Sequence, residues 1–274
     1  MLSPASSAAA SPVLGRASLL LLAGCNVVVG SGAMIVTGLL GPIGNELRVD
    51  TAAAGQLLIV SAVSFAVGAP VVAVLAGRVC RKELLFRALL VCGAALLAAA
   101  CAPDFTTLAM APAVSGMATA AFVPNAIAVA GALTSPAQRG RAVAIVFGGF
   151  TLALVVGAPA GTWIGLQVGW RLTLAALGVA AVATAVALKL RLPGGIMLPE
   201  ATLSAMRAVL ANRALRVTIG LNLLAAIGTF VLFSYAASAW PVLLRADAAV
   251  VAPALALVGI GSLVRNGVSA WAVD

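Results

Sequence analysis

The side chains able to do chemistry are few in this 274-residue sequence, and they form no catalytic set. Histidine is absent, so the usual general base near neutral pH is missing and Ser-His-Asp or Cys-His catalysis is excluded within the chain. The four cysteines (Cys25, Cys80, Cys92 and Cys101) contain no Cys-x-x-Cys pair, which argues against zinc and a disulfide framework. We therefore expect no catalytic residue, no metal and no cofactor, and the sequence disfavours a membrane-embedded enzyme.

Isolated polar residues inside long apolar stretches are the remaining candidates for a functional site. Arg265 is the only charge deep within such a stretch, and a charge there costs roughly 3 kcal/mol or more unless it faces a cavity or a partner. The alternative is that Arg265 extends its guanidinium to the membrane surface. Asparagines could bind a substrate or bridge two helices, and bridging is the commoner role. The substrate-pathway candidates are Asn26, Asn125, Thr151, Asn222, Tyr235 and Arg265.

The composition is that of an integral membrane protein. Only 8% of the residues are charged and 63% are hydrophobic, whereas a soluble domain carries about a quarter charged residues. A run of about 20 apolar residues is long enough to cross a bilayer as a helix. The sequence predicts an all-α membrane protein with eight spans, at residues 17–40, 52–76, 84–102, 105–133, 142–167, 170–188, 214–237 and 250–273.

The basic residues predict the orientation of these spans. With the N-terminus inside, only Arg48, Arg171 and Arg245 fall in gaps on the outer side, and the other basic residues up to Arg216 fall on the cytoplasmic side. The net charge of +9 does not indicate nucleic-acid binding, because no dense basic run lies beside aromatic residues. We expect a multi-pass protein of the plasma or inner membrane, in contact with the lipid bilayer, with a cytoplasmic N-terminus.

Two matches at one sequence offset predict a repeated six-span unit. Residues 47–52 (LRVDTA) resemble residues 244–249 (LRADAA), and Arg16-Ala17 matches Arg213-Ala214, each 197 residues later. The predicted divisions are a disordered tail (1–15), a six-helix half (16–190), a cytoplasmic linker with an amphipathic helix (191–212) and two helices of a second half (213–274). A complete second unit would bring the number of spans to twelve, so we expect the sequence to be C-terminally truncated. Two such halves are typical of transporters.

Span five carries a stripe of small residues. Gly149, Ala153, Gly157, Gly161 and Gly165 recur every fourth residue, which predicts a smooth face for close packing of another helix. Pro159 interrupts the stripe and predicts a kink, because proline removes a backbone hydrogen bond. Asp50 is placed to cap the second span.

The chain resembles the major facilitator superfamily, and within it the twelve-span drug:proton antiporter branch that includes arabinose and chloramphenicol efflux permeases. The loop 77–85 (GRVCRKELL) is similar to the family's signature loop in its basic positions, although Gly77 stands where an aspartate is expected. Its counterpart 197 residues later is Asp274. Span five resembles the antiporter motif of the branch. The resemblance implies gating or motif roles for Arg78, Arg81, Lys82, Gly148, Gly157, Pro159, Gly161 and Asp274.

The resemblance implies an efflux permease for a small organic solute or drug that works by alternating access. It also implies proton coupling and a monomeric full-length protein. No aspartate or glutamate lies in the interior of a span, and Pro112 occupies the place of an arginine common in the family, so coupling rests on the resemblance alone. The alternative is a non-transporting truncated fragment of such a permease. No nucleic-acid partner is expected.

Overall fold

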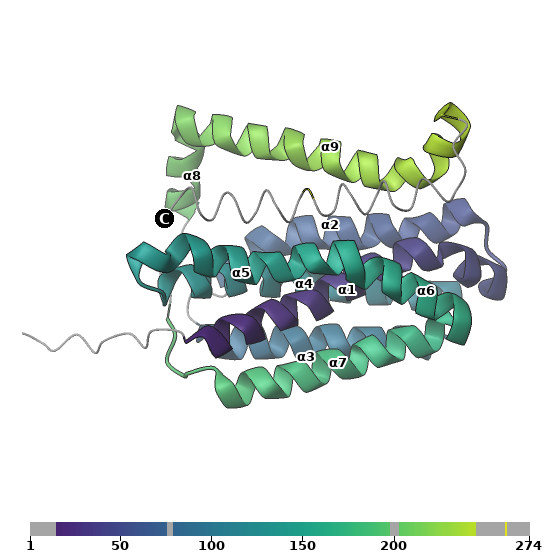
Figure 1. Cartoon of the computed structure of the whole chain (residues 1–274), viewed down its shortest axis with the longest axis horizontal. Helices are drawn as coiled ribbons and strands as arrows, with labels where there is room; N and C mark the ends of the chain where they lie inside the picture. The colour runs from purple at the N-terminus through teal and green to yellow at the C-terminus, as the bar shows by residue number, and fades with distance from the viewer. Residues whose placement is uncertain (1–14, 76–78, 198–202, 245–260, 262–274) are drawn as a thin grey trace, which may run out of the picture.

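The computed structural model describes residues 15–75, 79–197, 203–244 and 261, and this part of the chain is helical with no strand (Figure 1). Six of its helical segments are long and apolar enough to cross a membrane, which confirms the all-α membrane fold. The seventh predicted span lies within the 32-residue helix α9, and the eighth falls outside the described residues. The helices are α1 (Arg16–Leu47), α2 (Thr51–Leu75), α3 (Arg81–Ala100), α4 (Phe105–Ala132), α5 (Arg139–Leu152), α6 (Ala158–Val168), α7 (Trp170–Arg191), α8 (Leu203–Ala211) and α9 (Arg213–Leu244).

The helix ends follow from local side-chain chemistry. The Asp50 carboxylate accepts a hydrogen bond from the Ala53 N–H at 2.6 Å, as predicted for the start of α2. Asp104 caps α4 in the same way, accepting from the Thr107 N–H at 2.8 Å. Between α6 and α7 the chain turns at Gly169, whose φ of +94° suits a residue without a side chain.

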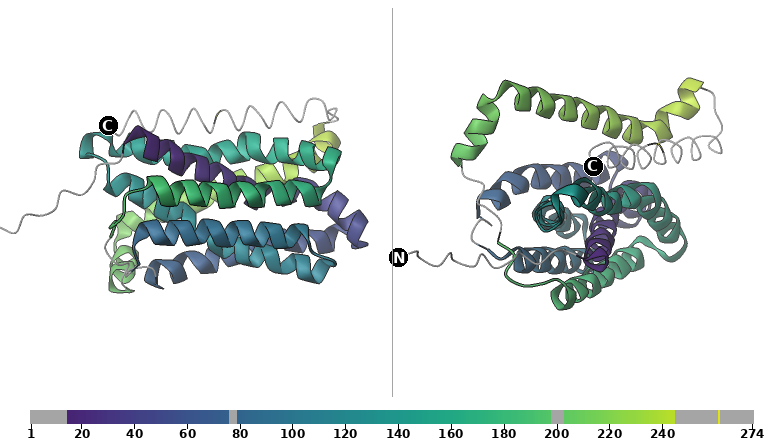
Figure 2. Two further views of the ribbon diagram at one scale, coloured as in Figure 1. Left: turned by 90° about the horizontal axis from the view of Figure 1, so that it is seen from below. Right: turned by 60° about the vertical axis from the view of Figure 1, so that its left-hand side comes forward.

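Helix α1 is the centre of the bundle. It contacts α2, α3, α4, α5, α6 and α7, and the pairs α3–α7, α2–α4 and α1–α5 complete the packing (Figure 2). One core cluster contains Leu22, Leu89 and Phe122. A second contains Ile35 and Trp170, further along the helices. Because the two clusters lie at different heights along α1, α3 and α4, these helices are packed at two levels.

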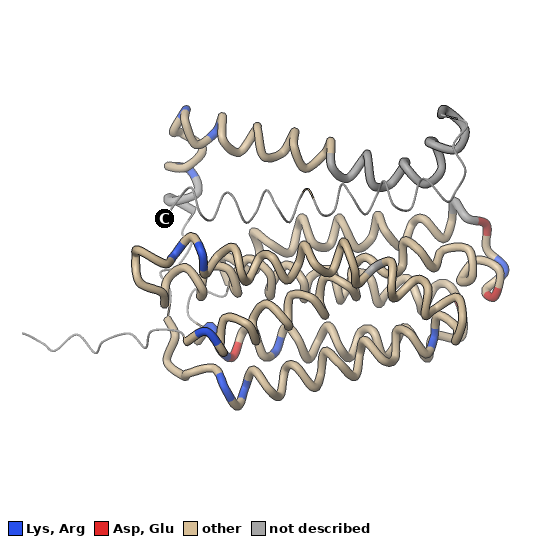
Figure 3. Tube along the Cα trace, in the orientation of Figure 1, with Lys and Arg blue, Asp and Glu red and all other residues tan. Residues whose placement is uncertain are grey.

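The described charges are divided unequally between the two ends of the bundle (Figure 3). The end at which α1, α3 and α5 begin and α7 finishes carries most of the lysines and arginines, and we call it the basic end. The opposite end carries fewer charges, namely Glu46, Arg48, Asp50, Asp104 and Arg171. This division matches the charge pattern predicted from the sequence, while the side of the membrane that each end faces stays a prediction.

Helices α1 to α7 form a six-helix bundle, in which α5 and α6 together make one predicted span. Helices α8 and α9 lie outside this bundle and contact each other. The Asn212 side-chain oxygen caps α9 by accepting from the Ala214 N–H at 3.0 Å. Along residues 213–228 the side chains of α9 are exposed, including those of Leu221 and Leu224. The predicted linker contains α8, while the amphipathic character of that helix and the division of the chain into halves stay predictions.

We predict that the Asp104 cap makes the free energy of unfolding depend on pH in the acid range. The backbone N–H and the hydroxyl of Thr107 stabilise the Asp104 carboxylate and hold its pKa below the ordinary value of 3.8. A depressed pKa gives stability that is complete above the unfolded-state pKa and is lost as the pH falls through the folded-state pKa. Thermal unfolding in detergent should therefore show wild type losing stability relative to Asp104→Asn below about pH 3.9. Asparagine still caps but does not titrate, so a difference that stays constant from pH 7 to pH 3 would contradict this prediction.

Candidate functional site

The small-residue stripe of span five packs against α1 in register. A Cβ atom added at Gly149 would strike the backbone carbonyl of Ala23, and one added at Gly157 would strike the Ser31 hydroxyl. The same relation pairs Gly161 with Ile35 and Gly165 with Leu39. The two members of every pair are 126 residues apart, because the helices run in the same direction and meet once per turn. At Gly149 the two backbones are in contact, and at the other three glycines an α1 side chain fills the place of the missing Cβ atom.

The segment between α5 and α6 is a π-helical turn, Ala153–Gly157, rather than a continuous α-helix. Pro159 explains its position, since proline lacks an N–H and its ring crowds the carbonyl of residue 155. The predicted kink is thus observed as a widened turn, and such turns occur frequently at functional sites. Helix α1 matches it with Gly30, whose added Cβ would meet the side chains of Ala153 and Phe150.

We call the close contact of α1 with α5 and α6 the first crossing. A second crossing, between α2 and α4, has the same arrangement. An added Cβ at Gly116 would meet Ser61 and Ser64 of α2, just as one at Gly30 would meet Phe150 and Ala153. Gly116 lies 86 positions after Gly30. Ser61 and Ser64 lie 89 positions before Phe150 and Ala153. With the same offset of 89, Gly68 and Pro70 correspond to Gly157 and Pro159. The two crossings are therefore related as inverted three-helix repeats would be.

Asn26 and Thr151 lie buried beside the first crossing. The Asn26 side-chain N–H donates to the carbonyls of Leu22 at 3.3 Å and Val146 at 3.1 Å, so it joins α1 to α5. The Thr151 hydroxyl donates to the Phe147 carbonyl of its own helix at 3.5 Å. The Asn26–Val146 hydrogen bond bridges two helices, and a role of Asn26 in the substrate pathway stays a prediction.

At the basic end, Arg81 joins three segments. Its guanidinium donates to the Asn125 side-chain oxygen of α4 at 3.0 Å, and its backbone N–H donates to the Ile196 carbonyl after α7 at 2.8 Å. Arg81 is buried, and Asn125 also donates to the Ala121 carbonyl at 2.9 Å. The structure therefore places Asn125, a predicted substrate-pathway residue, in a contact between helices. The neighbouring Lys82 is half-buried.

Glu83 connects α3 to α7 at the same end. One of its oxygens accepts from Arg87 at 2.9 Å and the other from Lys189 at 2.8 Å. The Lys189 ammonium also lies 4.2 Å from the centre of the Phe86 ring. These side chains are partly exposed, so they align the helix ends rather than supply much stability.

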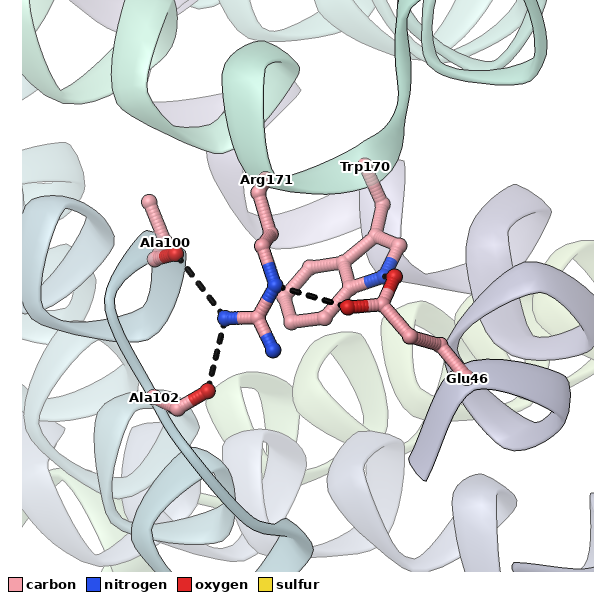
Figure 4. Close-up of polar contacts among 5 residues, drawn as sticks. All are labelled: Glu46, Ala100, Ala102, Trp170 and Arg171. Atoms are coloured by element: carbon pink, nitrogen blue, oxygen red, sulfur yellow. Dashed lines mark hydrogen bonds and ion pairs between the residues drawn. The ribbon is translucent and has the colours of Figure 1, made fainter. Parts of the chain in front are cut away.

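The opposite end is joined by a cluster around Arg171 (Figure 4). Glu46 at the end of α1 accepts hydrogen bonds from the Trp170 indole N–H at 2.7 Å and from Arg171 at 2.8 Å. The Arg171 guanidinium also donates to the carbonyls of Ala100 at 3.1 Å and Ala102 at 2.6 Å, at the end of α3. Sequence reasoning placed Arg171 on the outer side but missed this cluster. The available signal was an acid at the end of span one and a Trp-Arg pair at the start of span six.

Among the remaining predicted site residues whose side chains the structure describes, Asn222, Gly148 and Pro159 lie apart from these hydrogen-bonded clusters. Asn222 is exposed on α9, where it donates to the Thr218 carbonyl at 3.0 Å. An added side chain at Gly148 would meet nothing within 4 Å, and Pro159 is exposed. Tyr235 lies in α9. Arg78, Arg265 and Asp274 lie outside the described residues, so their predicted roles stay predictions.

Six described helical segments are long and apolar enough to cross a membrane, and the described charges gather toward the ends of the bundle (Figure 3), as in a multi-pass membrane protein. Residues 22–274 match the profile of the Major Facilitator Superfamily, and the chain belongs to this family. It is 33% identical over 184 residues to the chloramphenicol resistance protein of Streptomyces lividans, covering 67% of this chain and 47% of that protein. It is 29% identical over 238 residues to the inner membrane transport protein YdhP of Escherichia coli, covering 87% and 61%.

Solved structures show the same fold. The proton:xylose symporter XylE superposes with a TM-score of 0.67 at 14% identity, covering 94% of this chain and 69% of that one. The peptide transporter POT in complex with sulfate gives a TM-score of 0.59 at 17% identity, covering 85% and 49%. The predicted family and partial bundle are thus confirmed. The chain spans 47% and 61% of the lengths of the two relatives named above.

We predict that the two adjacent glycines of α5 differ sharply in their tolerance of a methyl group. Gly149→Ala drives its Cβ into the α1 backbone and should lower the free energy of unfolding by about 1–3 kcal/mol, as overpacking does. Gly148→Ala enters open space and should be neutral or stabilising by up to about 1 kcal/mol. Thermal unfolding in detergent measures both variants. Equal effects would contradict the register of α1 and α5.

The cluster at the opposite end predicts an order of effects. Arg171→Gln should lower the melting temperature more than Glu46→Gln, because only arginine holds both the carboxylate and the two α3 carbonyls. In a double-mutant cycle the pair should couple by about 0.2–1 kcal/mol, as partly exposed ion pairs do. Purely additive losses would show that the two side chains do not interact, and a larger loss for Glu46→Gln would contradict the predicted order.

Proposed function

We propose that the chain belongs to a secondary transporter that exports a small organic solute by alternating access. Membership of the Major Facilitator Superfamily and the 33% identity to a chloramphenicol resistance protein support this proposal. The observation that carries it is the pair of glycine crossings, α1 with α5–α6 and α2 with α4. Transporters built from inverted repeats open alternately to the two sides of the membrane as one group of helices rocks against another. The two related crossings fit such a protein.

The contacts at both ends support movement of the six-helix bundle as one unit. Arg81 and Glu83 tie α3 to α4 and α7 at the basic end, and Arg171 ties α1, α3 and α7 at the opposite end. A bundle tied at both ends transmits a displacement from one side of the membrane to the other. The π-helical turn lies between these ties and is the place where bending would be easiest.

The remaining elements of the proposal concern orientation, pathway and coupling. The basic end faces the cytoplasm, which places the N-terminus inside. Apolar spans without acids in their interiors favour a lipophilic solute of low charge. The proposed pathway residues remain Asn26, Asn125, Thr151, Asn222, Tyr235 and Arg265. The proposed gating or motif residues remain Arg78, Arg81, Lys82, Gly148, Gly157, Pro159, Gly161 and Asp274. Proton coupling is proposed from the family resemblance.

A second proposal is that these 274 residues do not transport by themselves. The observation that favours it is the partial coverage of the transporters it resembles, 47% and 61% of their lengths. In this case the chain would act only together with the remaining helices of a twelve-span protein.

A whole-cell accumulation assay separates the two proposals. We expect a twelve-span version to lower the accumulation of a lipophilic antibiotic in an efflux-deficient bacterium. Such a version has both halves, so its binding site can open to one side of the membrane while it is closed to the other. The 274-residue chain is expressed to the same membrane level beside it. Lowered accumulation with the shorter chain would overturn the second proposal. Unchanged accumulation with the twelve-span version, across a panel of small organic solutes, would overturn the first.

A further inference from the structure

An open groove lies between α3 and α4 on the outside of the six-helix bundle. Its volume is about 330 Å³, and its walls are apolar except for one arginine. Val91 of α3 and Val114 and Met117 of α4 line it with side chains that are 44–45% exposed. Because α3 and α4 run in opposite directions, Ala121 and Arg87 lie toward the basic end, and Val91 and Val114 lie toward the middle of the bundle.

The single charge of the groove stands at one end of it. The Arg87 side chain is 69% exposed and pairs with Glu83 through its Nε atom, and an arginine fork also presents two Nη groups. Glu83 is shared with Lys189, so one carboxylate is placed between two cations. The three side chains together carry one net positive charge. The end of the groove is therefore suited to an anion, while the rest of it is suited to hydrocarbon.

We propose that this groove binds one anionic phospholipid. Its phosphate lies at Arg87, and the first part of an acyl chain lies between Val91 and Val114. A helix rises 1.5 Å per residue, so the α4 wall from Ala121 to Val114 is roughly 10 Å long, enough for part of an acyl chain. A soluble anion would leave the apolar walls exposed, and an uncharged lipid would not use the arginine. The inference depends on the bundle lying in a bilayer and not on transport.

The test is lipid retention by the full chain in phosphatidylcholine nanodiscs that contain a minor fraction of spin-labelled phosphatidylglycerol. We expect a motionally restricted phosphatidylglycerol population that exceeds the one seen with spin-labelled phosphatidylcholine of the same chains. Arg87→Gln should weaken phosphatidylglycerol binding about five-fold, since one basic residue near an anionic headgroup contributes about 1 kcal/mol. Glu83→Gln should strengthen it, because Arg87 loses its competing carboxylate.

The opposite signs of these two effects separate lipid binding from a structural role. If the Glu83–Arg87 pair only stabilised the fold, both variants would reduce retention, and that result would overturn the proposal. Arg141→Gln, an exposed arginine of α5 at the same end, is the matched control and should change nothing. Val114→Trp fills the apolar part and should also reduce retention. Unchanged retention in Val114→Trp, or displacement by inorganic phosphate, would identify a simple anion site and overturn the proposal.

Discussion

The structure depends on how closely two helix backbones approach within a membrane. Hydrocarbon tails solvate leucine as well as another helix does, so helix pairing relies on contact between backbones and on hydrogen bonds. Helices α1 and α5–α6 meet this constraint over several turns. Gly149, Gly157, Gly161 and Gly165 each face the α1 residue that lies 126 positions earlier. Helix α1 lies at the centre of the bundle, because α2, α3, α4 and α7 contact it as well.

The second crossing gives the bundle its internal symmetry. Gly116 of α4 and Gly68 of α2 repeat the arrangement of Gly30 and Gly157, and Pro70 repeats Pro159. At the two ends, Arg81, Glu83 and Arg171 connect helices that are far apart in sequence, and beside the crossing Asn26 joins α1 to α5. Close glycine packing and these polar contacts together hold the helices of the bundle against one another.

Much of this organisation could be predicted from the sequence, for identifiable reasons. Apolar runs revealed the spans, the four-residue spacing revealed the stripe, and Asp50 revealed a helix start, because each signal is local in the chain. The partner of the stripe was not predictable, since any of the other helices could have packed against it. The π-helical turn, the Arg81–Asn125 contact and the Glu46–Arg171 cluster were missed for a related reason. The two contacts depend on which helix ends meet in space, and the acid and the Trp-Arg pair at the ends of spans one and six did not by themselves say that these ends meet. The turn depends on how α5 and α6 fit against α1.

The most direct test of the account exchanges the side chains at one contact of the central crossing. Ser31 and Gly157 face each other, and a side chain at 157 has room only if residue 31 gives up its own. The measurement is the thermal stability in detergent of Gly157→Ser, Ser31→Gly and the double variant. The account predicts that Gly157→Ser is destabilised and that adding Ser31→Gly restores most of the loss. A double variant whose loss equals the sum of the two single losses would contradict the in-register packing of α1 and α5–α6.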